Sequence, residues 1–366
     1  MMAINSRASI LVVAIACLTA CHQKVTPPET VFPGEHWVES KPDQVGLDKE
    51  RLKEFSTKTG GSGCVTRYGH LVHSWGHPGT AIDPGSVVKV IFSHLVQKSV
   101  KDGELPSLDA TAVQHEPALA ALNASLGHKD ARITWRHFLN QTACYGQTEE
   151  PGTAFDYNDF TMVLAWQIFA NKVYPGAFES ATSRVLDPML TKPLGCEDQP
   201  RYYANEGGAW TGRLFISPRD LCRFGLLYMM NGRWRDQQII AANTAHMAVT
   251  TPLPLDLPRT KAQSTEMLPG QITMGKGANQ EWHSGSYSFL WWINGIDENG
   301  KRFWPDAPPD TFGGFGYGGR NALVVIPSLG LVVSWVKTEF PITEMSGEGH
   351  VTVNGLLKVL VDSVRN

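Results

Sequence analysis

The sequence predicts a mixed α/β fold of the α+β type, with one antiparallel sheet built from both ends of the chain. An early segment, GCVTRYGHLVHSWG, has the pattern of two short strands around a turn at Tyr68-Gly69. A later segment, NALVVIP followed by SLG and LVVSWVKT, has the pattern of a second hairpin. The sequence between about residues 102 and 209 has mostly helical or irregular patterns. Strands at both ends with helices between them favour a sheet that is flanked by helices and carries an inserted helical subdomain, at about residues 102–235.

The composition is that of a globular protein with a large core. The chain has 366 residues, of which 42% are hydrophobic and 18% charged, and its formal net charge is −3. Because no block of Lys or Arg occurs, nucleic acid is not expected as a partner. No apolar run reaches the roughly 18 residues of a membrane-spanning helix.

The first residues have the pattern of an export signal. MMAINSR supplies a short basic segment, and ILVVAIACLTAC supplies an apolar segment that is too short to span a bilayer. Leu18-Thr19-Ala20-Cys21 resembles the lipobox of bacterial lipoproteins, which implies lipidation of Cys21. The expected division is then a signal peptide at 1–20, a Pro-rich tether at 21–45 and a folded domain at 46–366, anchored by lipid in the bacterial cell envelope and facing the periplasm. The alternative is a soluble export signal in which Cys21 is incidental.

Cysteine and histidine usage indicates no metal site. Four cysteines fall in the expected domain, which permits three disulfide pairings but equally fits small buried apolar residues: Cys64, Cys144, Cys196 and Cys222. The segment HLVHSWGH places His70 and His73 three positions apart on an expected strand, where they would face opposite sides. No C-x-x-C or H-E-x-x-H motif is present, so neither a metal nor a cofactor is expected.

Helices are predicted by apolar periodicity and by their end signals. LDKERLKEF places Leu52 and Phe55 on one side, and ARITWRHFLNQTA, DFTMVLAWQIFANKV and VTVNGLLKVLVDSV are further helical patterns. The segment beginning at Ser217-Pro218 combines a Ser N-cap with Pro at the first helical position, and it stops at Asn231-Gly232. From there to Phe312 the sequence is rich in tryptophan, and we expect it to form mostly loops.

One predicted helix, within Asp83 to Leu105, begins with a serine and carries a lysine three positions later. A serine hydroxyl needs a base within hydrogen-bond reach to act as a nucleophile. Residues three apart share a helix face, so Lys89 can lean over Ser86. Backbone N–H groups at the helix N-terminus suit a developing oxyanion. The alternative is an N-capping serine followed by a surface lysine.

The surroundings of Ser86 resemble those of a known enzyme superfamily. GSVVKVIFSHLVQKSVKDGELPSLDA, RITWRHFLNQTACYG and GRLFISPRDLCRFGLLYMMNGRW are similar to segments of the serine β-lactamase, penicillin-binding-protein and esterase superfamily, closest to class C β-lactamase-like hydrolases. The resemblance extends over nearly the whole expected domain. It implies a β-lactamase/transpeptidase-like fold, Ser86 as nucleophile and Lys89 as general base or charge partner.

The stretch from Pro151-Gly152-Thr153 to Asp159 resembles the second motif of that superfamily, Y-x-N. By this resemblance Tyr157 is a general acid/base between serine and lysine; the alternative is a core aromatic. Asp159 stands where Asn is usual. A carboxylate beside Lys89 would raise the lysine pKa, so we expect Asp159 to orient Lys89 and proton abstraction to fall more on Tyr157.

The third motif, K-T-G or H-x-G in the superfamily, has three possible positions. Lys58-Thr59-Gly60 precedes Ser86 and is interpreted as a helix C-terminus. His283-Ser284-Gly285 lies far ahead of the final hairpin. The best position is Tyr317-Gly318-Gly319, with Arg320, where glycines let substrate backbone approach and a backbone N–H supplies an oxyanion donor. The alternative is a glycine-rich turn.

Together these features predict a serine hydrolase that forms an acyl-enzyme on Ser86. The motif lysine that helps to hold a substrate carboxylate in β-lactamases is missing; Tyr317 cannot replace it, and Arg320 is the residue that could. An ester or amide of a small or peptide-like molecule is therefore the expected substrate rather than a β-lactam. The alternative is a non-catalytic relative that binds cell-wall peptides or a protein partner.

Overall fold

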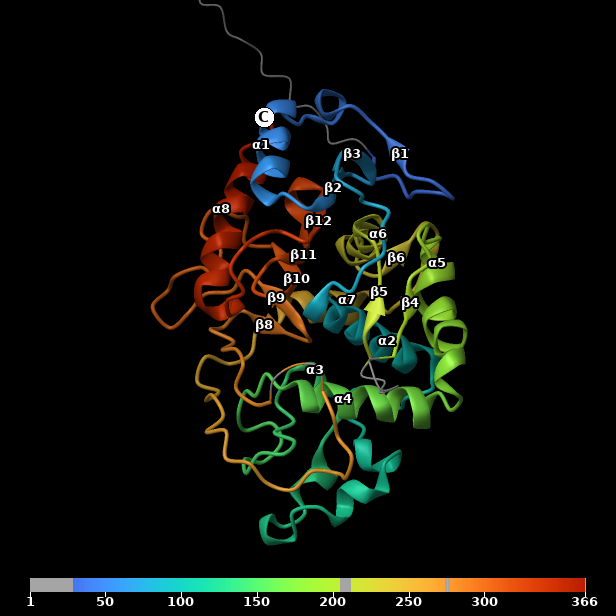
Figure 1. Cartoon of the computed structure of the whole chain (residues 1–366), viewed down its shortest axis with the longest axis vertical. Helices are drawn as coiled ribbons and strands as arrows, with labels where there is room; N and C mark the ends of the chain where they lie inside the picture. The colour runs from blue at the N-terminus through green and yellow to red at the C-terminus, as the bar shows by residue number, and fades with distance from the viewer. Residues whose placement is uncertain (1–28, 205–211, 274, 276, 366) are drawn as a thin grey trace, which may run out of the picture.

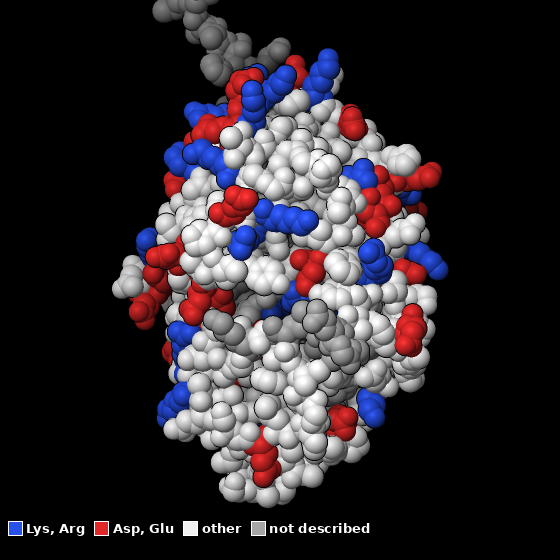
Figure 2. Space-filling model, in the orientation of Figure 1, with Lys and Arg blue, Asp and Glu red and all other residues white. Residues whose placement is uncertain are grey.

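The computed structural model describes residues 29–204, 212–273, 275 and 277–365. The expected signal peptide, Cys21 and the first part of the tether lie outside the described residues. Figure 1 shows the sheet and helices α1 and α8 in the upper part of the view, and α3, α4 and the irregular segments below them. Figure 2 shows the same face, on whose upper part basic and acidic residues are intermixed.

The central sheet is formed from the two ends of the chain, which confirms the predicted fold class. It has eight strands in the order β1-β3-β2-β12-β11-β10-β9-β8, and among them only β1 and β3 pair in parallel. The strands are β1 (Val38–Glu39), β2 (Ser62–Arg67), β3 (His70–Trp75), β8 (Tyr287–Ser288), β9 (Trp291–Ile293), β10 (Phe312–Gly316), β11 (Asn321–Ile326) and β12 (Leu331–Val336). Both expected hairpins are present, and β12 pairs with β2 to join them. Two-stranded pairs are formed by β4 (Arg201–Tyr202) with β5 (Leu214–Phe215) and by β6 (Arg233–Trp234) with β7 (Gln237–Gln238).

The middle of the sheet is covered on both faces, so its strands are buried throughout and mostly apolar, with Asn321 and Ser334 as buried polar residues. Every residue of β11 and β12 is buried. On one face α6 (Pro218–Met229) packs so closely that a Cβ on Gly225 would lie 2.4 Å from the Val332 side chain. On the other, Phe55 of α1 (Lys49–Thr59) packs edge-to-face on Trp335, and α8 (His350–Val361) lies beside α1 (Figure 1).

Most of the helices follow the sequence-based predictions, with some differences in length. The others are α2 (Val88–Asp102), α3 (Trp135–Leu139), α4 (Asp159–Ile168), α5 (Lys192–Leu194) and α7 (Ala242–Thr250). The side chain of Ser217 accepts the Asp220 N–H, as expected of an N-cap. The predicted helix around ARITWRHFLNQTA is only the short α3, whereas α7 lies in a region that was expected to be irregular.

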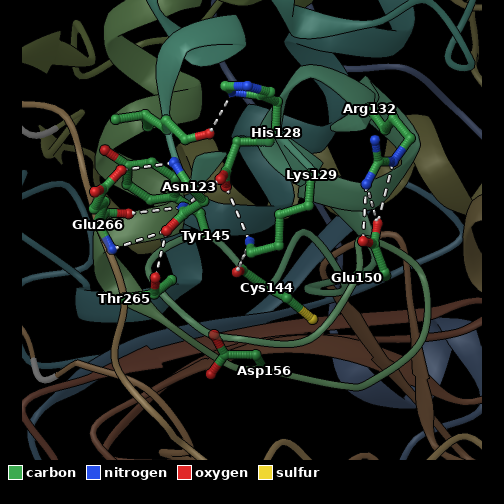
Figure 3. A network of polar contacts seen from close by, with 12 residues as sticks. Asn123, His128, Lys129, Arg132, Cys144, Tyr145, Glu150, Asp156, Thr265 and Glu266 are labelled. Carbon is green, nitrogen blue, oxygen red and sulfur yellow. Dashed lines mark hydrogen bonds and ion pairs between the residues drawn. The ribbon is translucent and has the colours of Figure 1, made fainter. Parts of the chain in front are cut away.

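A buried polar network ties the loop after α7 to the irregular segments below α4 (Figure 3). Lys129 and Asp130 form an ion pair at 3.1 Å with both side chains fully buried, and Lys129 also donates to the carbonyl oxygen of Cys144. The Asn123 amide donates to Asp130 at 2.6 Å, while the Asn123 backbone N–H donates to Glu266 at 2.6 Å. This network holds residues about 140 positions apart in fixed contact.

In the part of the chain that the structure describes, the helices are too short or too polar to span a membrane, and His, Cys, Asp and Glu side chains form no group of three or more that could hold a metal ion. The four described cysteines are free thiols; Cys64 and Cys222 lie with their sulfur atoms 3.6 Å apart between β2 and α6.

Candidate active site

Ser86 lies in a 3₁₀ turn, Gly85–Val87, immediately before α2. The turn is possible because Gly85 has a φ of +68°, a conformation that other residues rarely adopt. The Gly85 N–H donates to the side chain of Asp83 at 2.9 Å. A Cβ on Gly85 would also lie 2.7 Å from the Tyr317 ring. Ser86 is therefore half-buried at the N-terminal end of α2, as the sequence predicts.

Lys89 contacts both Ser86 and Asp159. Its ammonium group lies 3.0 Å from Ser86 Oγ and 2.8 Å from Asp159 Oδ1, and the residue is only 5% exposed. The Tyr157 ring centroid lies 4.6 Å from the same ammonium group. Ser86 also acts on the Tyr157 hydroxyl, whose pKa it lowers against the larger effect of burial. The structure thus brings together the four residues expected from the first two motifs.

The protonation states follow from burial and from the Lys89–Asp159 ion pair. Burial alone would lower the pKa of Lys89, but the negative charge of Asp159 and its hydrogen bond outweigh burial and raise this pKa. Burial would raise the pKa of Asp159, yet Lys89 holds it below its usual value. Burial raises the pKa of Tyr157, the Lys89 charge opposes this, and Asp159 adds to the rise. Lys89 is therefore an ammonium ion at neutral pH.

Asp159 is fixed from two sides. It is the first residue of α4, whose N-cap Asn158 accepts the Phe160 N–H at 2.9 Å, and a carboxylate is favourable at that helix end. Gln280 donates its side-chain amide to Asp159 at 3.3 Å and its backbone N–H to the Tyr157 carbonyl at 3.2 Å. The loop that contains Gln280 therefore closes the site over the second motif.

The end of β10 lies directly against Ser86. A Cβ on Gly316 would lie 2.2 Å from the Pro84 carbonyl oxygen and 3.1 Å from the Ser86 nitrogen. Only glycine allows this approach of strand to nucleophile. Sequence reasoning missed Gly316; the run of glycines in FGGFGYGG was the available signal.

Tyr317 is the member of the expected third motif that lies at the site. It has a positive φ of 54°, its side chain is 47% exposed, and its ring lies over Gly85. Its hydroxyl group accepts a hydrogen bond from Arg213 at 3.4 Å.

The other three residues of that expected motif make their contacts elsewhere. Gly318 packs against the backbone of Thr343, and Gly319 packs against α8. The Arg320 side chain donates to the Thr338 carbonyl at 2.9 Å. These contacts belong to the C-terminal segment rather than to the turn that carries Ser86.

The two other third-motif positions considered from the sequence have structural roles. Lys58 and Thr59 end α1, and Gly60, with a φ of 58°, caps it. His283 is fully buried, and its ring nitrogens contact the Leu257 carbonyl and the Gly285 N–H.

A second ion pair, which the sequence did not indicate, lies beside the nucleophile turn. Arg213 contacts both oxygens of Asp83, at 2.6 and 2.7 Å from one guanidinium nitrogen, and Tyr203 donates its hydroxyl to the same carboxylate at 2.5 Å. The Arg213 and Asp83 side chains are 15% and 18% exposed. Arg213 also acts electrostatically on Lys89 and Asp159, so the two ion pairs share one site.

A small hollow of about 50 Å³ opens next to Lys89 and Asp159. Its apolar wall comes from α2 and α4: Val88, Phe92, Met162, Val163 and Trp166. Because a dry cavity of about 150 Å³ admits benzene, this hollow fits an aliphatic group of a few atoms.

Comparison with known proteins identifies the family. The Beta-lactamase family model matches residues 49–350, and the chain belongs to that family. No curated protein sequence matches the chain.

Solved structures of the same fold include proteins of different activities. A beta-lactamase from Mycobacterium bovis is 16% identical (86% of this chain, 99% of that chain, TM-score 0.56). A penicillin-binding protein homolog from Caulobacter crescentus and a family VIII carboxylesterase are each 14% identical (86% of this chain, 97% of that chain, TM-score 0.55). At these identities the likeness establishes the fold, and the chemistry has to be argued from the site.

Proposed function

We propose that the protein is a serine hydrolase that cleaves a small ester or amide through an acyl-enzyme on Ser86. The observation that carries the proposal is the contact of the Ser86 hydroxyl with the Lys89 ammonium group, which itself lies 4.6 Å from the ring centroid of Tyr157. A hydroxyl group beside an ammonium ion, with a phenol group nearby, has both a route for its proton and a nearby charge to stabilise the anion.

In the first step Ser86 Oγ attacks the substrate carbonyl while its proton passes to the phenolate form of Tyr157, which is the minor form at neutral pH because burial raises the Tyr157 pKa. Lys89 is held as an ammonium ion by Asp159, so it cannot accept that proton directly; its charge instead stabilises the phenolate form of Tyr157. Tyr157 then returns the proton to the leaving alcohol or amine. The phenolate that remains then takes a proton from water, which hydrolyses the acyl-enzyme, and Tyr157 passes this proton to the departing Ser86 oxygen.

The negative charge on the substrate oxygen requires backbone donors. The Ser86 N–H lies in the first turn of a helix, where N–H groups have no intrahelical partner. The end of β10 lies against it, so we assign the second donor to the backbone at Gly316-Tyr317. Two such donors stabilise a tetrahedral intermediate in a site that excludes water.

The intact mass of the protein after exposure to a fluorophosphonate, and separately to a chromogenic penicillin, tests this function. We expect a fluorophosphonate adduct on the wild type and none on Ser86→Ala. A stable penicilloyl adduct without turnover would favour cell-wall peptide chemistry. The absence of both adducts on folded protein would favour the non-catalytic binding role.

The place of action proposed from the sequence is the bacterial cell envelope, through a lipid on Cys21. Cys21 lies outside the described residues, so the support is the lipobox-like Leu18-Thr19-Ala20-Cys21 alone. Metabolic labelling with an alkyne fatty acid should mark the wild type and spare Cys21→Ser.

A further inference from the structure

Two buried ion pairs lie beside Ser86. Lys89 is paired with Asp159 at 2.8 Å and Arg213 with Asp83 at 2.6 Å, and all four side chains are less than one-fifth exposed. In the described part of the chain, Lys89, Arg213 and Asp159 are the only charged residues that line the hollow next to the site. The other lining residues are neutral.

Asp83 engages Arg213 more completely than an ordinary ion pair requires. Three donor-acceptor contacts join the guanidinium group to the carboxylate, at 2.6, 2.7 and 3.2 Å. The carboxylate accepts two further hydrogen bonds, from Tyr203 and from the Gly85 N–H. Asp83 therefore fixes Arg213 and the Ser86 turn at once.

A guanidinium group that is already paired with a carboxylate in this way attracts a second anion only weakly. A second carboxylate near Arg213 would gain the Coulomb energy of the cation but lose a similar amount to Asp83, and it would have to displace bidentate hydrogen bonds. The same holds for Lys89 beside Asp159. Among the described residues, a substrate carboxylate in the hollow would thus find no free positive partner to compensate for its desolvation, which is unfavourable.

We propose that Asp83 is a positioning residue that sets substrate charge specificity: by neutralising Arg213, it makes the site select acyl groups without a negative charge. This inference rests on the proposed hydrolase function and adds a substrate class to it. Arg213 lies against Tyr317, whose ring covers the turn before Ser86. Release of Arg213 from Asp83 would therefore place a free cation at the edge of the substrate site.

Two matched esters test the proposal on the wild-type protein. p-Nitrophenyl valerate and p-nitrophenyl hydrogen glutarate have acyl chains of similar length, but only the second carries a carboxylate. Ser86→Ala supplies the blank for spontaneous hydrolysis. We expect kcat/KM to be at least about tenfold lower for the glutarate ester. Equal or faster turnover of the glutarate ester would overturn the proposal without any variant.

Asp83→Asn then tests the assigned residue. Freed of its partner, Arg213 should raise the glutarate-to-valerate ratio of kcat/KM by about tenfold, and high salt should reduce this gain. The double variant Asp83→Asn/Arg213→Met should return the ratio to the wild-type value. Asp109→Asn is the control: it breaks a more exposed ion pair, with Arg136, and should leave the ratio unchanged.

The ratio separates specificity from a general loss of activity, because structural damage lowers turnover of both esters alike. An unchanged ratio in an Asp83→Asn protein that still forms the fluorophosphonate adduct would overturn the role of Asp83. Failure of the wild type to form that adduct would instead overturn the proposed function, so the two failures are distinguishable.

Discussion

The ammonium group of Lys89 lies closer to Asp159 Oδ1, at 2.8 Å, than to the hydroxyl of Ser86, at 3.0 Å. Lys89 therefore contacts its ion-pair partner at least as closely as it contacts the nucleophile. In a buried pair of this kind each partner controls the protonation of the other.

Replacement of this carboxylate should alter the pH dependence more than the maximal rate. Asp159 raises the pKa of both Lys89 and Tyr157, so Asp159→Asn should lower both. A base acts above its pKa, and the acidic limb of kcat/KM should therefore move to lower pH. We expect kcat/KM on the plateau to stay within about tenfold of the wild type. A collapse of turnover in a folded variant would show that Asp159 has an essential role.

Removal of the phenol hydroxyl should abolish proton transfer with little change to the fold. Tyr157 is only 6% exposed and packs edge-to-face on Tyr287, contacts that Phe keeps. We expect Tyr157→Phe to lower kcat by about 10²- to 10⁴-fold. Thermal melting serves as the control, and near-normal turnover at an unchanged melting temperature would assign the base elsewhere.

A methyl group at the end of β10 should disturb the nucleophile directly. Gly316→Ala would press a Cβ against the Pro84 carbonyl oxygen and the Ser86 nitrogen. We expect a loss of about 1–3 kcal/mol in the free energy of unfolding and a fall of about 10²-fold in kcat. Gly355→Ala in α8, where nothing lies within 4 Å, is the matched control and should be neutral or slightly stabilising. A Gly316→Ala enzyme of normal activity would contradict the oxyanion role.

The buried Lys129–Asp130 pair should matter far more for stability than an exposed pair nearby. Lys129→Met would leave Asp130 buried without a cation, which costs about 3–5 kcal/mol of unfolding free energy. Arg132→Met breaks a pair with Glu150 whose side chains are 53% and 48% exposed, and it should cost less than about 1 kcal/mol. Denaturant unfolding of both variants measures the difference; equal costs would mean that the network in Figure 3 does not hold the loop.

Local signals in the sequence predicted the part of the site that depends on a single element. Ser86 and Lys89 lie one helical turn apart, and that spacing determines their contact wherever the helix lies in the fold. The hairpins and the Ser217 N-cap are likewise local, and the structure confirms them. Tyr157 could be selected only through resemblance to a family, because its approach to Ser86 depends on tertiary packing.

The features that the sequence did not reveal are long-range. Asp83 and Arg213 are 130 positions apart, and neither lies in a pattern that predicts its partner. Gly316 lies one residue before the expected third motif, and only the packing of β10 on the turn shows that it, rather than Gly318 or Gly319, approaches Ser86. Helix α7, ANTAHMAVT, lies within the segment that the sequence predicted to be rich in loops.

The pairing of β12 with β2 has a consequence for how the protein is made. These strands are more than 260 residues apart, and β10, which completes the site against Ser86, is held in the sheet through β11 and β12. During synthesis the nucleophile turn emerges early but has no strand to lie against until the final hairpin appears. Contacts of such long range slow folding. We therefore expect the chain to be inactive until the final hairpin is available to pair with β2.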